Sequence, residues 1–138
     1  MKKLFLIILP VALVLASCGS GSSKKQSAKS NNSMENISQV KLITVDPGHF
    51  HAALVQKSMY EQVSPDVHVY APEGPDYQEH LKKIQAYNSR PVNPTSWNEI
   101  VYTGADYLDK MLEEKAGNVV VLSGNNKKKA EYITKSIN

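Results

Sequence analysis

Four short apolar runs, each followed by a segment with helical spacing, constrain the fold more than any other feature of this sequence. The apolar runs span residues 40–45, 67–71, 100–102 and 118–122. The segments with helical spacing span residues 50–61, 76–88, 105–115 and 127–137. Strands that alternate with helices form parallel sheets through right-handed crossovers. The sequence therefore predicts an α/β fold of order βαβαβαβα, with helices on both faces of a parallel sheet.

Individual residues refine this prediction. Asp76 is a favourable N-cap for the second helix, and Gly117 is placed to end the third. The run 118–122 is apolar on both faces, which is typical of a buried parallel strand. In open parallel sheets, ligands bind at the carboxyl ends of the strands. The turns that follow the strands are therefore the places to look for a site.

The first 18 residues, MKKLFLIILPVALVLASC, have the parts of an export signal. Two lysines precede an apolar stretch that is shorter than the ~20 residues a membrane span needs. The end of the stretch, Leu15 to Gly19, resembles a bacterial lipobox. The resemblance implies cleavage after residue 17 and attachment of lipid to Cys18, which is the single cysteine of the chain. We therefore expect residues 1–17 to be a lipoprotein signal peptide.

Residues 18–38 are rich in Ser, Gly, Lys and Asn, which predicts a flexible tether ahead of a domain at 39–138. The tether would place the domain in the cell envelope as an exported, membrane-anchored lipoprotein. Because no acidic cluster follows Cys18, the periplasmic side is favoured. Residues 38–138 hold 11 Lys and Arg against 12 Asp and Glu, so the domain lacks the basic excess of a nucleic-acid-binding protein. The run 127–129 is interpreted as a solvated helix start.

The turn Asp46-Pro47-Gly48-His49-Phe50-His51 after the first strand allows two interpretations. Asp46, His49 and His51 could bind a metal, as in a metal-dependent hydrolase, although no further ligand is obvious. Alternatively, Gly48 could let the backbone approach a pyrophosphate at the start of the following helix. The second interpretation is favoured, and we predict no metal site.

The segment from Val40 to Asn138 resembles the N-terminal domain of the Gfo/Idh/MocA oxidoreductases. The strongest local similarity is NVVVLSGNNKKKAEYITKSI, which looks like the fourth strand and following helix of that family, with Asn126 on its Asn and Ala130-Glu131 on its Ala-Glu. YTGADYLDKML looks like the third strand and its helix, and DPGHFHAAL like a variant of the first turn. The resemblance implies a Rossmann-like fold and NAD or NADP as cofactor.

On this resemblance, backbone contacts to the pyrophosphate would come from Gly48, His49 and Phe50, and Glu73 would face the adenosine ribose. The nicotinamide end would be approached by Ser123, Gly124 and Asn126. The sequence departs from the family pattern in its single glycine at the first turn and in Gly124-Asn125, which stands where Thr-Pro is usual.

The family continues into a strand that carries a catalytic lysine and then into a sugar-binding domain. The chain ends before these segments, so the Rossmann-like sheet is expected to be incomplete and no catalytic residue is assigned. The favoured function is the cofactor-binding half of a membrane-tethered NAD(P)-dependent oxidoreductase that acts on sugars or their derivatives. The alternative is a non-catalytic lipoprotein that keeps the fold for binding or assembly.

Overall fold

The structure is a computed structural model that describes residues 39–137. The predicted signal peptide, Cys18 and the tether lie outside these residues. Among the described residues, no helix is both long enough and apolar enough to cross a membrane. The elements in chain order are β1 (Leu42–Val45), α1 (His51–Leu54), β2 (Asp66–Ala71), α2 (Pro75–Ser89), β3 (Asn98–Thr103), α3 (Tyr107–Glu114), β4 (Val119–Leu122) and α4 (Asn126–Ser136).

The four strands form one parallel sheet in the order β3-β2-β1-β4. Ile43 in β1 is paired with His68 of β2 on one side and with Val120 of β4 on the other. The chain runs outward from β1 through β2 to β3, and then returns to place β4 beside β1. This arrangement confirms the predicted α/β fold, a Rossmann-like parallel sheet.

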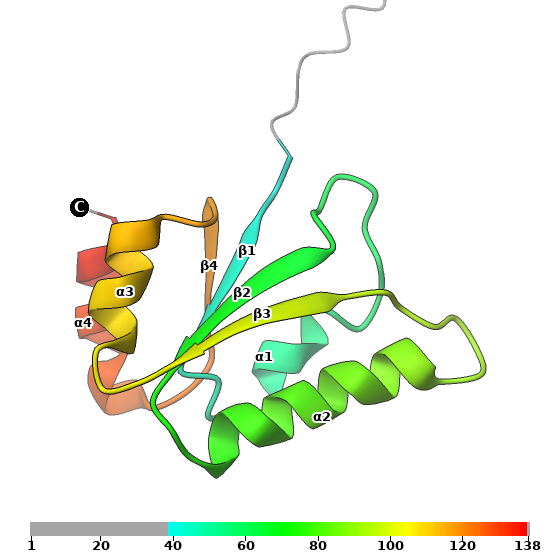
Figure 1. Ribbon diagram of the computed structural model, residues 1–138, viewed down its shortest axis with the longest axis horizontal. Coiled ribbons are helices and arrows are strands. Elements are labelled where there is room, and N and C mark those ends of the chain that lie inside the picture. Colours follow the sequence, from blue (N-terminus) through cyan, green and yellow to red (C-terminus); the bar gives the residue numbers. More distant parts are fainter. Residues whose placement is uncertain (1–38, 138) are drawn as a thin grey trace, which may run out of the picture. The chain divides into compact units, whose positions relative to one another are not determined.

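Helices cover both faces of the sheet, as the alternation predicted. Side chains of successive strand residues point to opposite faces, so Leu42 and Ile43 enter different cores. Leu42 packs with Ala53, Val67, Ile84 and Trp97, on the face covered by α1 and α2. Ile43 and Val45 pack on the other face with Tyr70 and with four buried residues of α3 and α4, which are Tyr107, Leu108, Met111 and Tyr132. Figure 1 shows α3 and α4 together, apart from α1 and α2.

The predicted helix over residues 50–61 is wrong beyond its first turn, because α1 ends at Leu54. The next two turn bonds, from the N–H groups of Gln56 and Lys57, span three residues instead of four. Trp97 explains the change of path. Its indole Nε1–H donates to the Gln56 carbonyl oxygen at 2.6 Å, and both side chains are almost fully buried. A helical spacing in the local sequence cannot anticipate this long-range bond.

The start of α2 also differs from the prediction. Gly74, not Asp76, occupies the N-cap position, with φ of 156°, and Pro75 is the first helical residue. Proline is well suited to that position because its missing N–H would have had no partner there. Asp76 therefore lies in the first turn of α2, where its carboxylate makes no capping hydrogen bond.

The third helix is ended by Lys115 and not by Gly117. Lys115 adopts the left-handed conformation (φ 46°, ψ 44°), and its N–H donates to the Met111 carbonyl oxygen at 3.1 Å. Gly117 serves a different purpose: a Cβ there would lie 2.5 Å from the carbonyl oxygen of Lys41. The absent side chain lets the loop before β4 pack directly against the start of β1.

The strand β4 is less buried than its sequence predicted. It lies at an edge of the four-stranded sheet. Val119 is 41% exposed, and the following three residues are half-buried. A run that is apolar on both faces is typical of a central parallel strand. Within the described residues, β4 is therefore more apolar than an edge strand needs to be.

Candidate functional site

The order of the strands reverses between β1 and β4, and the turns that follow these two strands meet there. The His49 N–H donates to the carbonyl oxygen of Ser123 at 3.0 Å, which joins the two turns directly. In open α/β sheets, such a reversal point at the carboxyl ends of the strands is where ligands bind. The structure therefore brings Gly48, His49 and Phe50 together with Ser123 and Gly124, although they lie about 75 positions apart in the sequence.

Asp46 fixes the conformation of the first turn. Its φ is 45°, a left-handed conformation that costs energy for a residue with a side chain. Its N–H donates to the Tyr70 carbonyl at 3.0 Å, and its own carbonyl accepts from the Gly48 N–H at 2.7 Å. Its carboxylate, in a residue only 8% exposed, accepts a hydrogen bond from the Tyr132 hydroxyl at 2.7 Å. These bonds hold the turn in one shape before any ligand arrives.

The hydroxyl that binds Asp46 belongs to a buried pair of tyrosines. Tyr132 of α4 is hydrogen-bonded to Tyr107 of α3, and Lys128 Nζ donates to the Tyr107 hydroxyl at 3.4 Å. Burial, and then the hydrogen bonds with Tyr107 and Asp46, raise the pKa of Tyr132 far above the ordinary value of a phenol. Tyr132 therefore stays protonated and donates to Asp46, which ties the turn to the helices on this face.

The metal interpretation of this turn has no support in the geometry. The Asp46 carboxylate is occupied by a hydrogen bond from Tyr132, and the rings of His49 and His51 pack against each other, with their centres 4.4 Å apart. Within residues 39–137, no group of three or more His, Cys, Asp or Glu side chains is arranged to hold a metal ion. A hydrolase that used Asp46, His49 and His51 would lack its ligand set.

The two glycines of the site have different roles. A Cβ on Gly124 would lie 2.0 Å from the carbonyl oxygen of Asp46, so Gly124 is required for the two turns to touch. A Cβ on Gly48 would lie 3.3 Å from a carboxylate oxygen of Asp76 and 3.9 Å from the Asn125 nitrogen. The space that Gly48 leaves is thus bounded by α2 and by the start of α4. A ligand that approaches the backbone at Gly48 would touch both.

In the part of the chain that the structure describes, one backbone N–H group of the first turn is left without a partner. The Gly48 and His49 N–H groups are used within the site, and among the described residues the Phe50 N–H has no partner. Asn125 is the N-cap of α4, and its side chain accepts from the Lys127 N–H at 2.9 Å. The predicted site residue Asn126 is the exposed first residue of that helix.

The first turn of α4 contains the lysine run 127–129 and no acidic residue. Positive charge at a helix N-terminus opposes the helix dipole and costs stability. The run does lie at a helix start, with Lys127 and Lys128 exposed, as the sequence predicted. Its position beside the switch point gives the site a positive charge on the β4 side.

A cavity of about 170 Å³ adjoins Gly48 on the opposite side, between the β1–α1 turn and α2; we call it the α2 cavity. Its lining residues are Pro47, Gly48, His49, Phe50, Asp76, Glu79, His80 and Lys83. Glu73, the predicted ribose ligand, is exposed in the loop between β2 and α2 and is not among them. The acidic residue that the structure brings to Gly48 is Asp76, which sequence reasoning had assigned to a helix cap.

His80 is the most unusual residue of the α2 cavity. Its side chain is 2% exposed, and neither ring nitrogen has a hydrogen-bond partner. Its Nε2 lies 3.7 Å from Oε2 of Glu99, while the other Glu99 oxygen accepts from Gln56. Buried polar groups are nearly always hydrogen-bonded, so His80, whose two ring nitrogens are buried without a hydrogen bond, is an exception among the residues that line this cavity.

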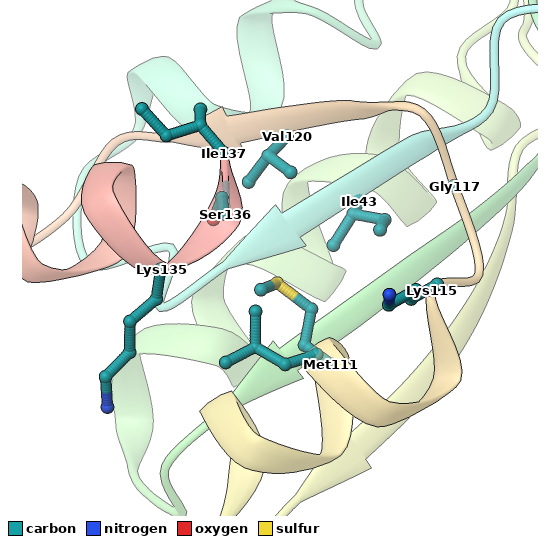
Figure 2. Close-up of a pocket in the computed structure, with 9 residues that line it drawn as sticks. Ile43, Met111, Lys115, Gly117, Val120, Lys135, Ser136 and Ile137 are labelled. Carbon is teal, nitrogen blue, oxygen red and sulfur yellow. The ribbon is translucent and has the colours of Figure 1, made fainter.

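A larger cavity, of about 470 Å³, lies at the other end of the sheet (Figure 2). It opens between the C-terminal ends of α3 and α4, and its floor is formed by Ile43 and Val120. Its lining is mainly apolar, with Lys115 and Lys135 at the margin. Because it lies at the amino ends of the strands, it is separate from the switch point and from the predicted site residues.

Comparisons with known proteins give one informative similarity. No protein-family model matches the chain, and no curated protein matches it. A solved structure from Parabacteroides merdae ATCC 43184, described as "a putative oxidoreductase", is 68% identical and superposes with a TM-score of 0.71. The match covers 72% of this chain and 23% of the other, so the chain spans about a quarter of that protein's length.

Proposed function

We propose that this chain binds NAD or NADP at the β1–β4 switch point and is the cofactor-binding half of an oxidoreductase. The observation that carries the proposal is the joining of two turns at the strand reversal, with the open position of Gly48 between them. The similarity to part of a protein described as an oxidoreductase supports the same assignment. A nicotinamide dinucleotide supplies hydride transfer, and the protein supplies binding and orientation.

The residues at the switch point fit a pyrophosphate. Gly48 has no side chain to keep the phosphate away, and the Phe50 N–H is available as a donor. Because α1 is a single turn, its dipole contributes little. The lysines at the start of α4 supply positive charge instead, and they occupy a position that the helix alone would not favour. The strained, fully bonded turn at Asp46 orients the site in advance.

The proposal includes further polypeptide, because hydride transfer needs a substrate held against the cofactor. The 68%-identical protein is about four times as long as the matched segment. The outer edge of β4 carries no further strand among the described residues, and its side chains are apolar. We propose that the remainder of the oxidoreductase covers this edge and binds a sugar or sugar derivative, as the resemblance to the Gfo/Idh/MocA enzymes suggested.

The lipid anchor on Cys18 is part of the same proposal, since a tethered domain at the periplasmic side would act on substrates in the cell envelope. Mass spectrometry of the protein extracted from membranes tests it. We expect a diacylglycerol-modified Cys18 at the N-terminus, and we expect a Cys18→Ser variant to leave the membrane fraction. An unmodified, soluble mature chain would refute the anchor without affecting the nucleotide site.

Cofactor binding is tested by titration with NADH while the nicotinamide fluorescence is followed. Trp97 is a poor reporter of contact, because it is buried at the amino end of β3, away from the switch point. The Gly48→Ala and Gly48→Val variants should weaken binding progressively as the side chain grows, because each fills the space beside Asp76 and Asn125. Thermal unfolding checks that both variants fold. A wild-type chain that shows no enhancement at millimolar NADH would refute the function.

A further inference from the structure

We infer that Asp46 and Tyr132 together replace the glycine that begins a dinucleotide-binding turn, which makes Tyr132 a positioning residue for the cofactor. This inference rests on the proposed function and goes beyond it, since it assigns a role in binding to a buried side chain of α4. In the dinucleotide-binding fingerprint, the first of three glycines makes the tight turn after the first strand. This chain has Asp46 at that place.

The backbone of Asp46 has a shape that a glycine would adopt without cost. Its φ is 45°, in the left-handed region that is unfavourable for a residue with a side chain. The Asp46 carbonyl oxygen accepts from the Gly48 N–H and lies 2.0 Å from the place where a Cβ of Gly124 would be. This one carbonyl group therefore sets both the path of the chain at Gly48 and its distance from the turn after β4. A change of Asp46 to negative φ would turn the carbonyl away and would move Gly48 from the place where a pyrophosphate would bind.

The side chain of Asp46 holds this strained backbone in place. Asp46 is buried, and within residues 39–137 its carboxylate forms no ion pair with a lysine, arginine or histidine. The donor that it has is the Tyr132 hydroxyl, at 2.7 Å. A buried carboxylate that loses its donor is costly, so removal of this hydroxyl would draw the Asp46 side chain toward water. The backbone would then relax out of the left-handed conformation.

A chain of donors fixes the direction of the Tyr132 hydroxyl. An ionised carboxylate only accepts, so Tyr132 donates to Asp46 and accepts from the Tyr107 hydroxyl. Tyr107 in turn accepts from Lys128 Nζ at 3.4 Å. Both tyrosines are buried, and their rings meet edge to face with centres 6.3 Å apart. The helices α3 and α4, which lie together in Figure 1, thus aim one hydroxyl at the cofactor turn.

Tyr70 provides a matched control in the same hydrophobic core as Tyr132. Tyr70 is also a buried tyrosine whose hydroxyl donates to a carboxylate, but that carboxylate belongs to Glu114 at the C-terminal end of α3. Replacement of either tyrosine by phenylalanine removes one hydroxyl and one hydrogen bond to a carboxylate. The replacement at Tyr132 alone removes a bond to the cofactor turn.

The test measures the affinity of the full chain for NADH by nicotinamide fluorescence, and thermal unfolding checks that each variant folds. Tyr132→Phe should weaken NADH binding about tenfold, which is the size expected when one hydrogen bond to a charged group is lost. Tyr70→Phe should also lower the melting temperature, because it removes the corresponding bond to Glu114. Its affinity for NADH should stay within about twofold of the wild-type value.

A double-mutant cycle separates an effect through Asp46 from a general effect on the fold. Asp46→Gly should bind NADH about tenfold more tightly than Asp46→Ala, because glycine adopts a positive φ without any partner and alanine does not. This comparison holds even if Tyr132→Phe does not fold. Addition of Tyr132→Phe to the Asp46→Gly chain should weaken binding by less than about twofold, since no carboxylate remains to be held.

Four outcomes would overturn the inference. Unchanged affinity in a folded Tyr132→Phe chain would refute it while the proposed function stands. An equal loss of affinity in Tyr70→Phe would show that binding follows overall stability and not the position of the turn. A tenfold loss that persists in the Asp46→Gly background would mean that Tyr132 does not act through Asp46. No binding of NADH to a folded wild-type chain would refute the inference together with the proposed function.

Discussion

Gly124 provides a direct test of the contact between the two turns. A Cβ at this position would lie 2.0 Å from the Asp46 carbonyl oxygen and 3.2 Å from the Gly48 nitrogen. Both neighbours are backbone atoms, so no side-chain rotation can relieve the contact. In a Gly124→Ala variant, the turns must separate by about 1 Å to reach even a tight contact. The hydrogen bond from the His49 N–H to the Ser123 carbonyl, now 3.0 Å long, would then be lost.

The expected loss of stability is the sum of two contributions, the lost hydrogen bond and the overpacking of the two turns. Loss of the hydrogen bond costs about 1 kcal/mol, and overpacking between rigid backbones costs about 1–3 kcal/mol. We therefore expect Gly124→Ala to lower the free energy of unfolding by about 3 kcal/mol. Because Gly124 does not have a positive φ, the whole effect comes from the contact and not from backbone strain. Domains of this size have total stabilities of about 5–15 kcal/mol, so the variant should still fold.

Urea unfolding followed by Trp97 fluorescence measures this effect, since Trp97 is 4% exposed and its indole is hydrogen-bonded. The control is Gly48→Ala, in which the tightest contact of the new Cβ would be with the end of the Asp76 side chain, at 3.3 Å, while the backbone atoms of Gly124 and Asn125 would lie at ordinary contact distances of 3.6 and 3.9 Å. That change should alter the free energy of unfolding by less than about 1 kcal/mol. If both variants were equally stable, the two turns would not be in contact, and the site geometry described above would be refuted.

Three further predictions concern the surroundings of the site. Tyr132→Phe should destabilise the chain by about 2 kcal/mol in urea unfolding, because it removes the hydroxyl donor to the buried Asp46 carboxylate; an unchanged midpoint would contradict the bond. The hydrogen bond from Tyr70 lowers the pKa of Glu114, so its contribution to stability is fully present above the ordinary pKa of a glutamate and is lost as the pH falls from there through the lowered pKa. Glu114→Gln should therefore lower the melting temperature at pH 7, and this loss should shrink steadily as the pH is lowered into the acid range. A loss of the same size at every pH would rule out the ionised carboxylate as its source. Asn125→Ala should cost about 1 kcal/mol as a lost helix cap, measured by calorimetry, and a neutral result would show that another group caps α4.

The order of elements could be predicted because it depends on local patterns. The apolar runs and helical spacings located all four strands and all four helices, and their alternation implied a parallel sheet. The turn after β1 could be singled out for the same reason, since Gly48 follows an apolar run and precedes a helix. The length of α1 could not be predicted, because it is set by a bond between Gln56 and Trp97, which lie 41 positions apart.

The sequence by itself determined the fold class and the turns at which a ligand can bind, because hydrophobic periodicity and turn residues act over a few positions. Only the tertiary structure decided which residues meet at those turns. It placed Asp76 beside Gly48, paired Tyr132 with Asp46, and left His80 buried without a partner. These contacts depend on how α2 and α4 cross the sheet. That packing is set by the sum of many side-chain volumes and not by any short pattern in the chain.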